Sequence, residues 1–554
     1  MNTGGGVRHS AGPRLGRGRR PSVRCSVAST ILTVVLLGLC IGVGGATVGA
    51  GASVAGAAPS GQAPDGVATV DGSIQGATVG STNEYLGIPY AAPPVGSLRW
   101  RAPKPAAHWS GVRSATTFAR HCPQDASEFG VASVSENCLY LNVYTPSTDH
   151  GTGNLPVMVW FHGGVFVWGE SDDWNPAQLV GNGVIVITVN YRLGALGFLA
   201  HPALTGRGGS SGNYGLMDQQ AALRWVQDNV ERFGGDAHGV TIFGESAGGL
   251  SVLSQLASPG AHGLFSGAIV ESGAYTLTPQ TRSAAEIDGK AFADRAGCAD
   301  QRAACLRSLP VSTILKDQDS GYQPDIDGLV LTRSLKSAFA TGKFNHVPVT
   351  DGTNLDERRL FVAIYQLIGD PVTAANYQQM IASILHVSAP TAGTIDTQYP
   401  LSSYSSPAIA MSALWTDESF SCPALSVDQS LSKYVPTYSY EFADENAPER
   451  YEPPVGFPYG ASHDSEVQYL FDQSNTPFPG VLSASQQQLA ASMRQDWSSF
   501  AKHGSPSSTS GAIWERFTQS GHQTLELVPP AATTETDFAA VHHCSFWAHL
   551  NVSG

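Results

Sequence analysis

Short, continuous apolar runs recur through the middle of the chain, with a helix-like stretch between them. Residues 155–161 (LPVMVWF) and 181–191 (GNGVIVITVNY) have the length of strands and suit strands that are buried on both faces. Residues 240–244 and 267–271 predict two further strands. Residues 217–233 have helical spacing and place on one face Ala221, Ala222, Trp225 and Val226. Strands that alternate with helices predict an α/β fold whose large central sheet is mostly parallel and flanked by helices.

The segments on either side are less regular. Residues 67–80 alternate apolar with small or polar positions, which predicts a small N-terminal antiparallel hairpin. Residues 84–109 are rich in proline and aromatics and predict an ordered, wrapped loop. The remaining expectations are a strand at 139–144, surface helices over 280–345, strand and turn over 346–361, a long polar, loop-rich region after it, strands at 436–443 and 524–528, and a helix near 484–502.

The first 66 residues look like an export signal followed by a linker. Six arginines lie within the first 24 residues, an apolar run covers residues 31–43, and Ala55-Gly56-Ala57 fits an A-x-A cleavage site. We therefore expect a signal peptide over residues 1–57, a Pro/Gly linker over 58–66 and a single domain over 67–554, in a secreted protein. An uncleaved membrane anchor is the alternative, because small residues extend the apolar run to spanning length.

Charge and cysteine content agree with export. The formal net charge is −14, and removing residues 1–57 takes away six positive charges and no negative ones, which gives −20. Such an acidic surface argues against nucleic acid or an anionic membrane as partner. Six of the eight cysteines lie beyond residue 57, and their even number without CxxC spacing indicates three disulfides rather than a metal site. Spacing alone leaves fifteen pairings open.

A strand, a tight turn and a helix follow one another over residues 240–256, VTIFGESAGGLSVLSQL. Gly244 and Gly248 flank Ser246 in the pattern G-x-S-x-G, which lifts a serine hydroxyl clear of a sheet at a helix N-terminus. The pattern also occurs by chance around Ser210 in GGSSG, with no strand before it and no helix directly after. We read Ser210 as part of a flexible loop and Ser246 as the candidate nucleophile.

A serine nucleophile needs a base and an acid. In sheet proteins with this strand, turn and helix, called a nucleophile elbow, the chain order is serine, acid, histidine. Asp356 and Glu357 follow the strand-like HVPVT in a Gly/Asn-containing turn, and either could be the acid. His463 is the favoured base, at an expected junction of strand and loop with small neighbours. His542 and His543 are adjacent to Cys544, which leaves them less freedom to reach a site.

Several longer segments resemble the type-B carboxylesterase family of α/β-hydrolases, which includes the cholinesterases, from about Val67 to Trp547. They are EYLGIPYAAPPVGSLRW, SENCLYLNVYTP, HGGVF, NYRLGALGFL, GNYGLMDQQAALRWVQDNVERFGGD, VTIFGESAGG, GTNLDERRLF, SHDSEVQYLF and CSFW. The resemblance implies Ser246 as nucleophile, Glu357 as acid and His463 as base, with Ser272 supporting the acid. It also implies the disulfides Cys122–Cys138, Cys298–Cys305 and Cys422–Cys544.

The resemblance places the oxyanion hole at the N–H groups of Gly164, Val165 and Ala247. Val165 departs from the family, which has a glycine or alanine there. A valine still offers its N–H, but its branched side chain restricts the backbone and fills space beside the acyl carbon, so bulky tertiary-alcohol esters should be poor substrates. The implied chemistry is hydrolysis of a small-molecule ester by water through an acyl-enzyme, with no cofactor, metal or obligatory protein partner.

The Cys122–Cys138 segment bears on the substrate. In cholinesterases the corresponding loop is longer and carries a tryptophan that binds quaternary ammonium, and in lipases a long version forms a lid. Here fifteen residues separate the cysteines, and Phe129 is the only aromatic among them. We expect neutral short- to medium-chain or aryl esters as substrates. A lipase for longer acyl chains is the alternative, and a non-catalytic binding module is disfavoured because serine, acid and histidine are all present.

Overall fold

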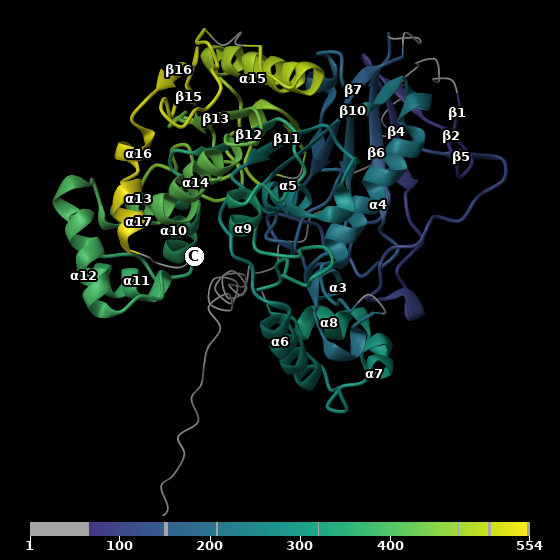
Figure 1. Ribbon diagram of the computed structural model, residues 1–554, viewed down its shortest axis with the longest axis horizontal. Coiled ribbons are helices and arrows are strands. Elements are labelled where there is room, and N and C mark those ends of the chain that lie inside the picture. The colour runs from purple at the N-terminus through teal and green to yellow at the C-terminus, as the bar shows by residue number, and fades with distance from the viewer. Residues whose placement is uncertain are drawn as a thin grey trace, which may run out of the picture.

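The computed structural model describes residues 66–148, 153–206, 209–319, 321–474, 476–507 and 511–550 (Figure 1). The predicted signal peptide and all but the last residue of the predicted linker lie outside these residues, so both stay predictions. No helix in the described ranges is long and apolar enough to cross a membrane.

A twisted sheet of 11 strands forms the centre of the molecule. Neighbouring strands are parallel from β15 to β9, and the strands at both edges are antiparallel. In spatial order the strands are β16 (Thr533–Glu535), β15 (Thr524–Leu527), β13 (Thr437–Phe442), β12 (Val349–Asn354), β11 (Gly267–Glu271), β10 (Gly235–Glu245), β7 (Leu155–Phe161), β9 (Ile185–Val189), β6 (Tyr140–Pro146), β4 (Thr82–Pro89) and β3 (Ala77–Val79). The predicted α/β architecture with a mostly parallel sheet is confirmed.

Helices cover both faces of this sheet (Figure 1). The apolar run of β7 is buried on both sides, because Val157 and Val159 contribute to one core and Met158 and Trp160 to the other. The first core includes residues of α4 (Tyr214–Asn229) and α5 (Ala247–Ala257), and the second includes α15 (Ala484–His503). As expected, Trp225 and Val226 of α4 are buried.

The N-terminal hairpin is present but short. Strands β1 (Val67–Ala68) and β2 (Ser73–Gln75) pair antiparallel and form a small separate sheet with β5 (Val112–Ser114). Residues 77–79 do not join this hairpin but form β3 at the edge of the large sheet. A two-stranded ladder between β8 (Trp174–Asn175) and β14 (Asp472–Gln473) lies outside both sheets.

The expected loop-rich region after residue 361 is wrong, because this part of the chain is helical. Helix α14 packs on the sheet beside β12 and β13, and helices α10 to α13 form the lobe that carries their labels in Figure 1. Its short helices are buried against one another through a core of their own, and the prolines at α12 and α13 stand in the first turn, where proline is tolerated. The helices are α10 (Arg358–Leu367), α11 (Tyr377–Ile384), α12 (Ala389–Gln398), α13 (Pro407–Thr416), a π-helical turn Asp417–Ser421 and α14 (Cys422–Leu431).

Helices α6, α7 and α8 lie together below the sheet in Figure 1, whereas α9 lies beside α14 and α5. The predicted surface helices over 280–345 are present as separate elements. They are α6 (Arg282–Arg295), α7 (Ala303–Ser308), α8 (Val311–Asp317) and α9 (Leu335–Ala340), and shorter helices elsewhere are α2 (Ala177–Val180), α3 (Gly194–Phe198), α16 (Phe538–Val541) and α17 (Cys544–Leu550).

Strand β12 is longer than its sequence indicates. Asp351, Gly352 and Asn354 were expected in a turn, but Asp351 and Gly352 pair with both β11 and β13, and Asn354 pairs with β13. Their hydrogen bonds to these neighbours override the turn preference of the residues. The turn begins only after Asn354, which brings Glu357 to the end of the strand.

Candidate active site

Ser246 stands on a sharp turn between β10 and α5. Its backbone has φ 54° and ψ −118°, a conformation that costs energy for a residue with a side chain and persists only when the surroundings enforce it. The turn requires glycine nearby, because a Cβ on Gly244 or Gly248 would press on the carbonyl oxygen of Phe161 in β7. The predicted strand, turn and helix are therefore present, with Ser246 as the N-cap of α5.

The structure brings Ser246 together with the predicted base and acid. The Nε2 atom of His463 lies 2.9 Å from the Ser246 hydroxyl oxygen, and its Nδ1 atom lies 2.6 Å from Oε2 of Glu357. The Glu357 side chain is fully buried, and its other oxygen, Oε1, accepts a hydrogen bond of 3.0 Å from the backbone N–H of Asn354. This chain of contacts fixes the imidazole between hydroxyl and carboxylate.

Asp356 points elsewhere. Its Oδ1 lies 2.7 Å from Nη2 of Arg359, and its Oδ2 accepts a hydrogen bond of 3.1 Å from the N–H of Ala461. The geometry therefore separates two neighbouring acids that sequence reasoning left open. His463 itself lies in a turn before the 3₁₀ segment Val467–Tyr469, so its expected position at a strand end is wrong.

The loop after β7 faces the serine with free backbone donors. Among the described residues, the N–H groups of Gly164, Val165 and Ala247 have no hydrogen-bond partner. Gly164 and Val165 have positive φ values of 95° and 48°, and Val165 lines the cavity beside Ser246. A branched residue at positive φ is strained.

Several buried carboxyl groups surround the histidine. Oε1 of Glu245 lies 3.1 Å from Nε2 of His463. Burial and the neighbouring acids Asp464 and Glu466 raise the pKa of Glu245 well above its usual range, and burial raises the pKa of Asp464 to about 7. Both carboxyls therefore hold their protons to higher pH than exposed carboxyls do.

Other residues that the sequence singled out lie apart from this chain of contacts. Ser272 is buried next to the elbow, but its hydroxyl has no hydrogen-bond partner in the part of the chain that the structure describes, so no direct bond supports Glu357. Ser210 is also buried and donates a 2.6 Å hydrogen bond to Asp327, so the expectation of a flexible loop is wrong at this residue. His542 lies between Asp417 and Glu441, at 2.6 and 2.7 Å.

The cavity over Ser246 has mostly apolar walls. Phe361 and Ile364 of α10 line one part, and Phe129 of the Cys122–Cys138 loop lines another. Two further aromatics, Trp168 and Trp174, line the cavity from the segment after the oxyanion loop and were not predicted from the sequence. No sequence motif marks these two tryptophans, because they reach the cavity only through the fold.

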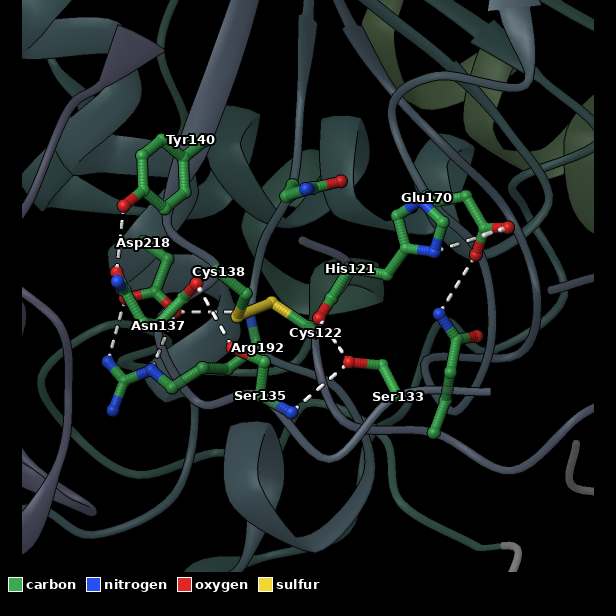
Figure 2. The surroundings of a disulfide bond; sticks show 12 residues. His121, Cys122, Ser133, Ser135, Asn137, Cys138, Tyr140, Glu170, Arg192 and Asp218 are labelled. Atoms are coloured by element: carbon green, nitrogen blue, oxygen red, sulfur yellow. Dashed lines mark hydrogen bonds and ion pairs between the residues drawn. A yellow bond between two sulfur atoms is a disulfide. The ribbon is translucent and has the colours of Figure 1, made fainter. Parts of the chain in front are cut away.

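The Cys122–Cys138 loop is held down from inside (Figure 2). The buried Glu170 accepts hydrogen bonds from the Gln124 amide at 2.9 Å and from the N–H of Val131 at 2.9 Å. Ser133 donates a 2.7 Å hydrogen bond to the carbonyl oxygen of His121 beside the disulfide. These hydrogen bonds hold the loop in place as one wall of the cavity. The structure also contains the disulfides Cys298–Cys305 and Cys422–Cys544.

Comparison with known proteins gives a consistent result. Residues 63–547 match the Carboxylesterase family. The chain belongs to this family. It is 34% identical to the cocaine esterase of Homo sapiens over 86% of this chain and 88% of that protein, and 33% identical to the para-nitrobenzyl esterase of Bacillus subtilis over 85% and 96%. The solved structure of a thermophilic PNB esterase covers 85% of this carboxylesterase and 97% of its own chain, with a TM-score of 0.73 and 32% identity.

These likenesses make the protein a carboxylic ester hydrolase of the α/β-hydrolase fold, as its sequence predicted. The carboxylesterase also contains functional candidates that sequence reasoning missed. Asn354 holds Glu357 through a backbone bond, and Glu245 contacts His463. Glu245 could have been found from the sequence, because it directly precedes Ser246 in the G-x-S-x-G motif.

Proposed function

We propose that this carboxylesterase is a secreted serine esterase that works through an acyl-enzyme on Ser246. The observation that carries the proposal is the continuous contact from the Ser246 hydroxyl through His463 to Glu357. His463 takes the serine proton as the hydroxyl oxygen attacks the ester carbonyl carbon, and Glu357 holds the ring and stabilises its positive charge.

Charge on the carbonyl oxygen is then stabilised by the N–H groups of Gly164, Val165 and Ala247. His463 returns the proton to the leaving alcohol, which departs as the acyl-enzyme forms. A water molecule repeats the sequence on the acyl-enzyme, and the carboxylic acid leaves. Every proton in this scheme moves between the serine, the imidazole, the alcohol and water.

The substrate class follows from the cavity walls. Apolar and aromatic side chains line most of the cavity, and burial raises the pKa of two of its carboxyls, Glu245 and Asp464, which favours a neutral ester. We propose short- to medium-chain or aryl esters as substrates. The tied Cys122–Cys138 loop argues against a lipase lid, so the rate should not jump above the substrate's solubility limit.

Export is supported by the three disulfides, which form and persist in oxidising compartments. The proposed signal peptide can be checked by sequencing the N-terminus of protein from the culture medium. A start near residue 58 is expected, whereas an intact Met1 in a membrane fraction would contradict secretion.

Kinetics of Ser246→Ala on p-nitrophenyl butyrate test the catalytic assignment. The rate constant kcat should fall by roughly a millionfold, as in hydrolases whose triad acts as a unit. Ser210→Ala is the matched control, a serine in the same short motif, and should leave kcat unchanged. Full activity of Ser246→Ala would overturn the proposal.

A further inference from the structure

The guanidinium of Arg358 is enclosed by three aromatic rings directly beside Glu357. Its central carbon lies 4.2 Å from the ring centroid of Trp415, 4.5 Å from that of Phe361 and 4.6 Å from that of Phe420. Its Nε donates a 2.8 Å hydrogen bond to Ser419. Rings at these distances attract a cation through their faces, so the rings and the guanidinium fix one another.

Two rings of this cage also contact the proposed base. The ring centroids of Phe361 and Phe420 each lie 5.2 Å from that of His463. Phe361 comes from α10, and Phe420 comes from the π-helical turn Asp417–Ser421. π-helical turns often occur at functional sites, and this one directs a phenylalanine ring at the imidazole. Arg358 is therefore linked to the position of His463 through these two rings and not by a direct contact.

Arg358 also brings positive charge to an acidic region. The charged or titratable groups facing it are Glu357, Glu418, Tyr275 and Tyr365. Burial lowers the pKa of Arg358 to about 10, so the group remains a cation at neutral pH. None of the ion pairs within the described ranges uses its guanidinium. Its charge is thus available to the nearby Glu357 carboxylate.

We propose that Arg358 is a positioning residue for the esterase reaction, holding Phe361 and Phe420 against His463 and placing its positive charge beside Glu357. This inference rests on the proposed function, because it assigns a role through His463 and Glu357. It adds a residue that contacts neither substrate nor the reacting atoms.

Two substitutions separate the packing role from the charge. Arg358→Met keeps the apolar stem and removes the cation, and Arg358→Lys keeps the cation and removes the planar group that stacks on the rings. Arg359→Met is the matched control, since Arg359 pairs with Asp356 and lies outside the cage. The measurements are kcat, KM and the pH profile of kcat/KM with p-nitrophenyl butyrate, after thermal melting has shown which variants are folded.

Arg358→Met should lower kcat by roughly 10- to 100-fold with KM nearly unchanged. Without the guanidinium the two phenylalanine rings no longer hold His463 in place, and a misplaced base slows the chemical step. Loss of the cation favours the imidazolium, so the acid limb of the profile should move to higher pH by about one unit. Arg358→Lys should lose part of kcat but keep the acid limb in place, and Arg359→Met should change neither.

An acid limb that is unmoved in Arg358→Met, or an equal shift in Arg358→Lys, would overturn the charge role. An unchanged kcat in both variants would overturn the positioning role. If Arg358→Met does not fold, Arg358→Lys and Phe420→Leu decide the packing role, since both should lower kcat. Failure of the proposed function is distinguishable, because the wild-type enzyme would then not be labelled on Ser246 by an organophosphate.

Discussion

Val165 occupies a backbone conformation that suits glycine better than valine. Its φ of 48° is positive, and its side chain lines the cavity next to Ser246. Val165→Gly should relieve the strain and enlarge the space beside the acyl carbon. We expect kcat/KM for a tert-butyl ester to rise by roughly tenfold relative to the ethyl ester. A ratio unchanged from wild type, in a folded variant, would show that Val165 does not limit the alcohol group.

A second test asks which of the neighbouring acids Asp356 and Glu357 supports His463. Glu357→Gln leaves the shape of the side chain but cannot stabilise the imidazolium, so kcat should fall by roughly 10³- to 10⁴-fold. Asp356→Asn affects a carboxyl that contacts Arg359 and Ala461, and it should change kcat far less. Steady-state kinetics of both variants make the comparison, and equal losses would leave the acid unassigned.

Among the elements, the disulfide Cys422–Cys544 ties α14 to α17 across a separation of 122 residues, whereas Cys298–Cys305 spans only 7. In the chain-entropy model the longer loop contributes roughly 5 kcal/mol to stability and the shorter one about 2.5 kcal/mol. Replacing Cys422 and Cys544 by serine should therefore lower the free energy of unfolding more than replacing Cys298 and Cys305. Urea denaturation of both double variants measures this, and the reverse order would contradict the entropic account.

Elements with a strong local signal were predictable. The strand and turn around Ser246 follow from a short apolar run and the spacing of Gly244 and Gly248, and β7 follows from its unbroken apolar run. The helical lobe after residue 361 was not predictable, because its short helices depend on a shared core. The cage around Arg358 was also invisible in the sequence, since Trp415 and Phe420 lie more than fifty residues away.

The whole molecule buries many carboxyl groups whose pKa is raised by folding. Burial raises the pKa of Asp351 and Asp428 well above their usual range, that of Asp464 to about 7 and that of Glu271 to about 8. Such a group keeps its proton in the folded protein after the unfolded chain has released it. Its contribution to stability is therefore largest below the unfolded value of about 4 and declines as the pH rises.

His542 acts in the same direction. Burial lowers its pKa, but the contacts with Glu441 and Asp417 outweigh burial and raise it well above the usual value. A raised imidazole pKa stabilises the fold at low pH and loses this effect as the pH rises. We expect the urea midpoint to be lower at pH 9 than at pH 6, with a shallower decline in Asp351→Asn. A midpoint that rises toward pH 9 would contradict this expectation.

The central claim is that Ser246 becomes covalently acylated, and labelling with an organophosphate tests it most directly. The purified enzyme is treated with diethyl p-nitrophenyl phosphate, digested and mapped by tandem mass spectrometry. The account predicts one phosphorylated serine, Ser246, in step with the loss of esterase activity. Inactivation with the label on Ser210, or with no label on Ser246, would contradict it.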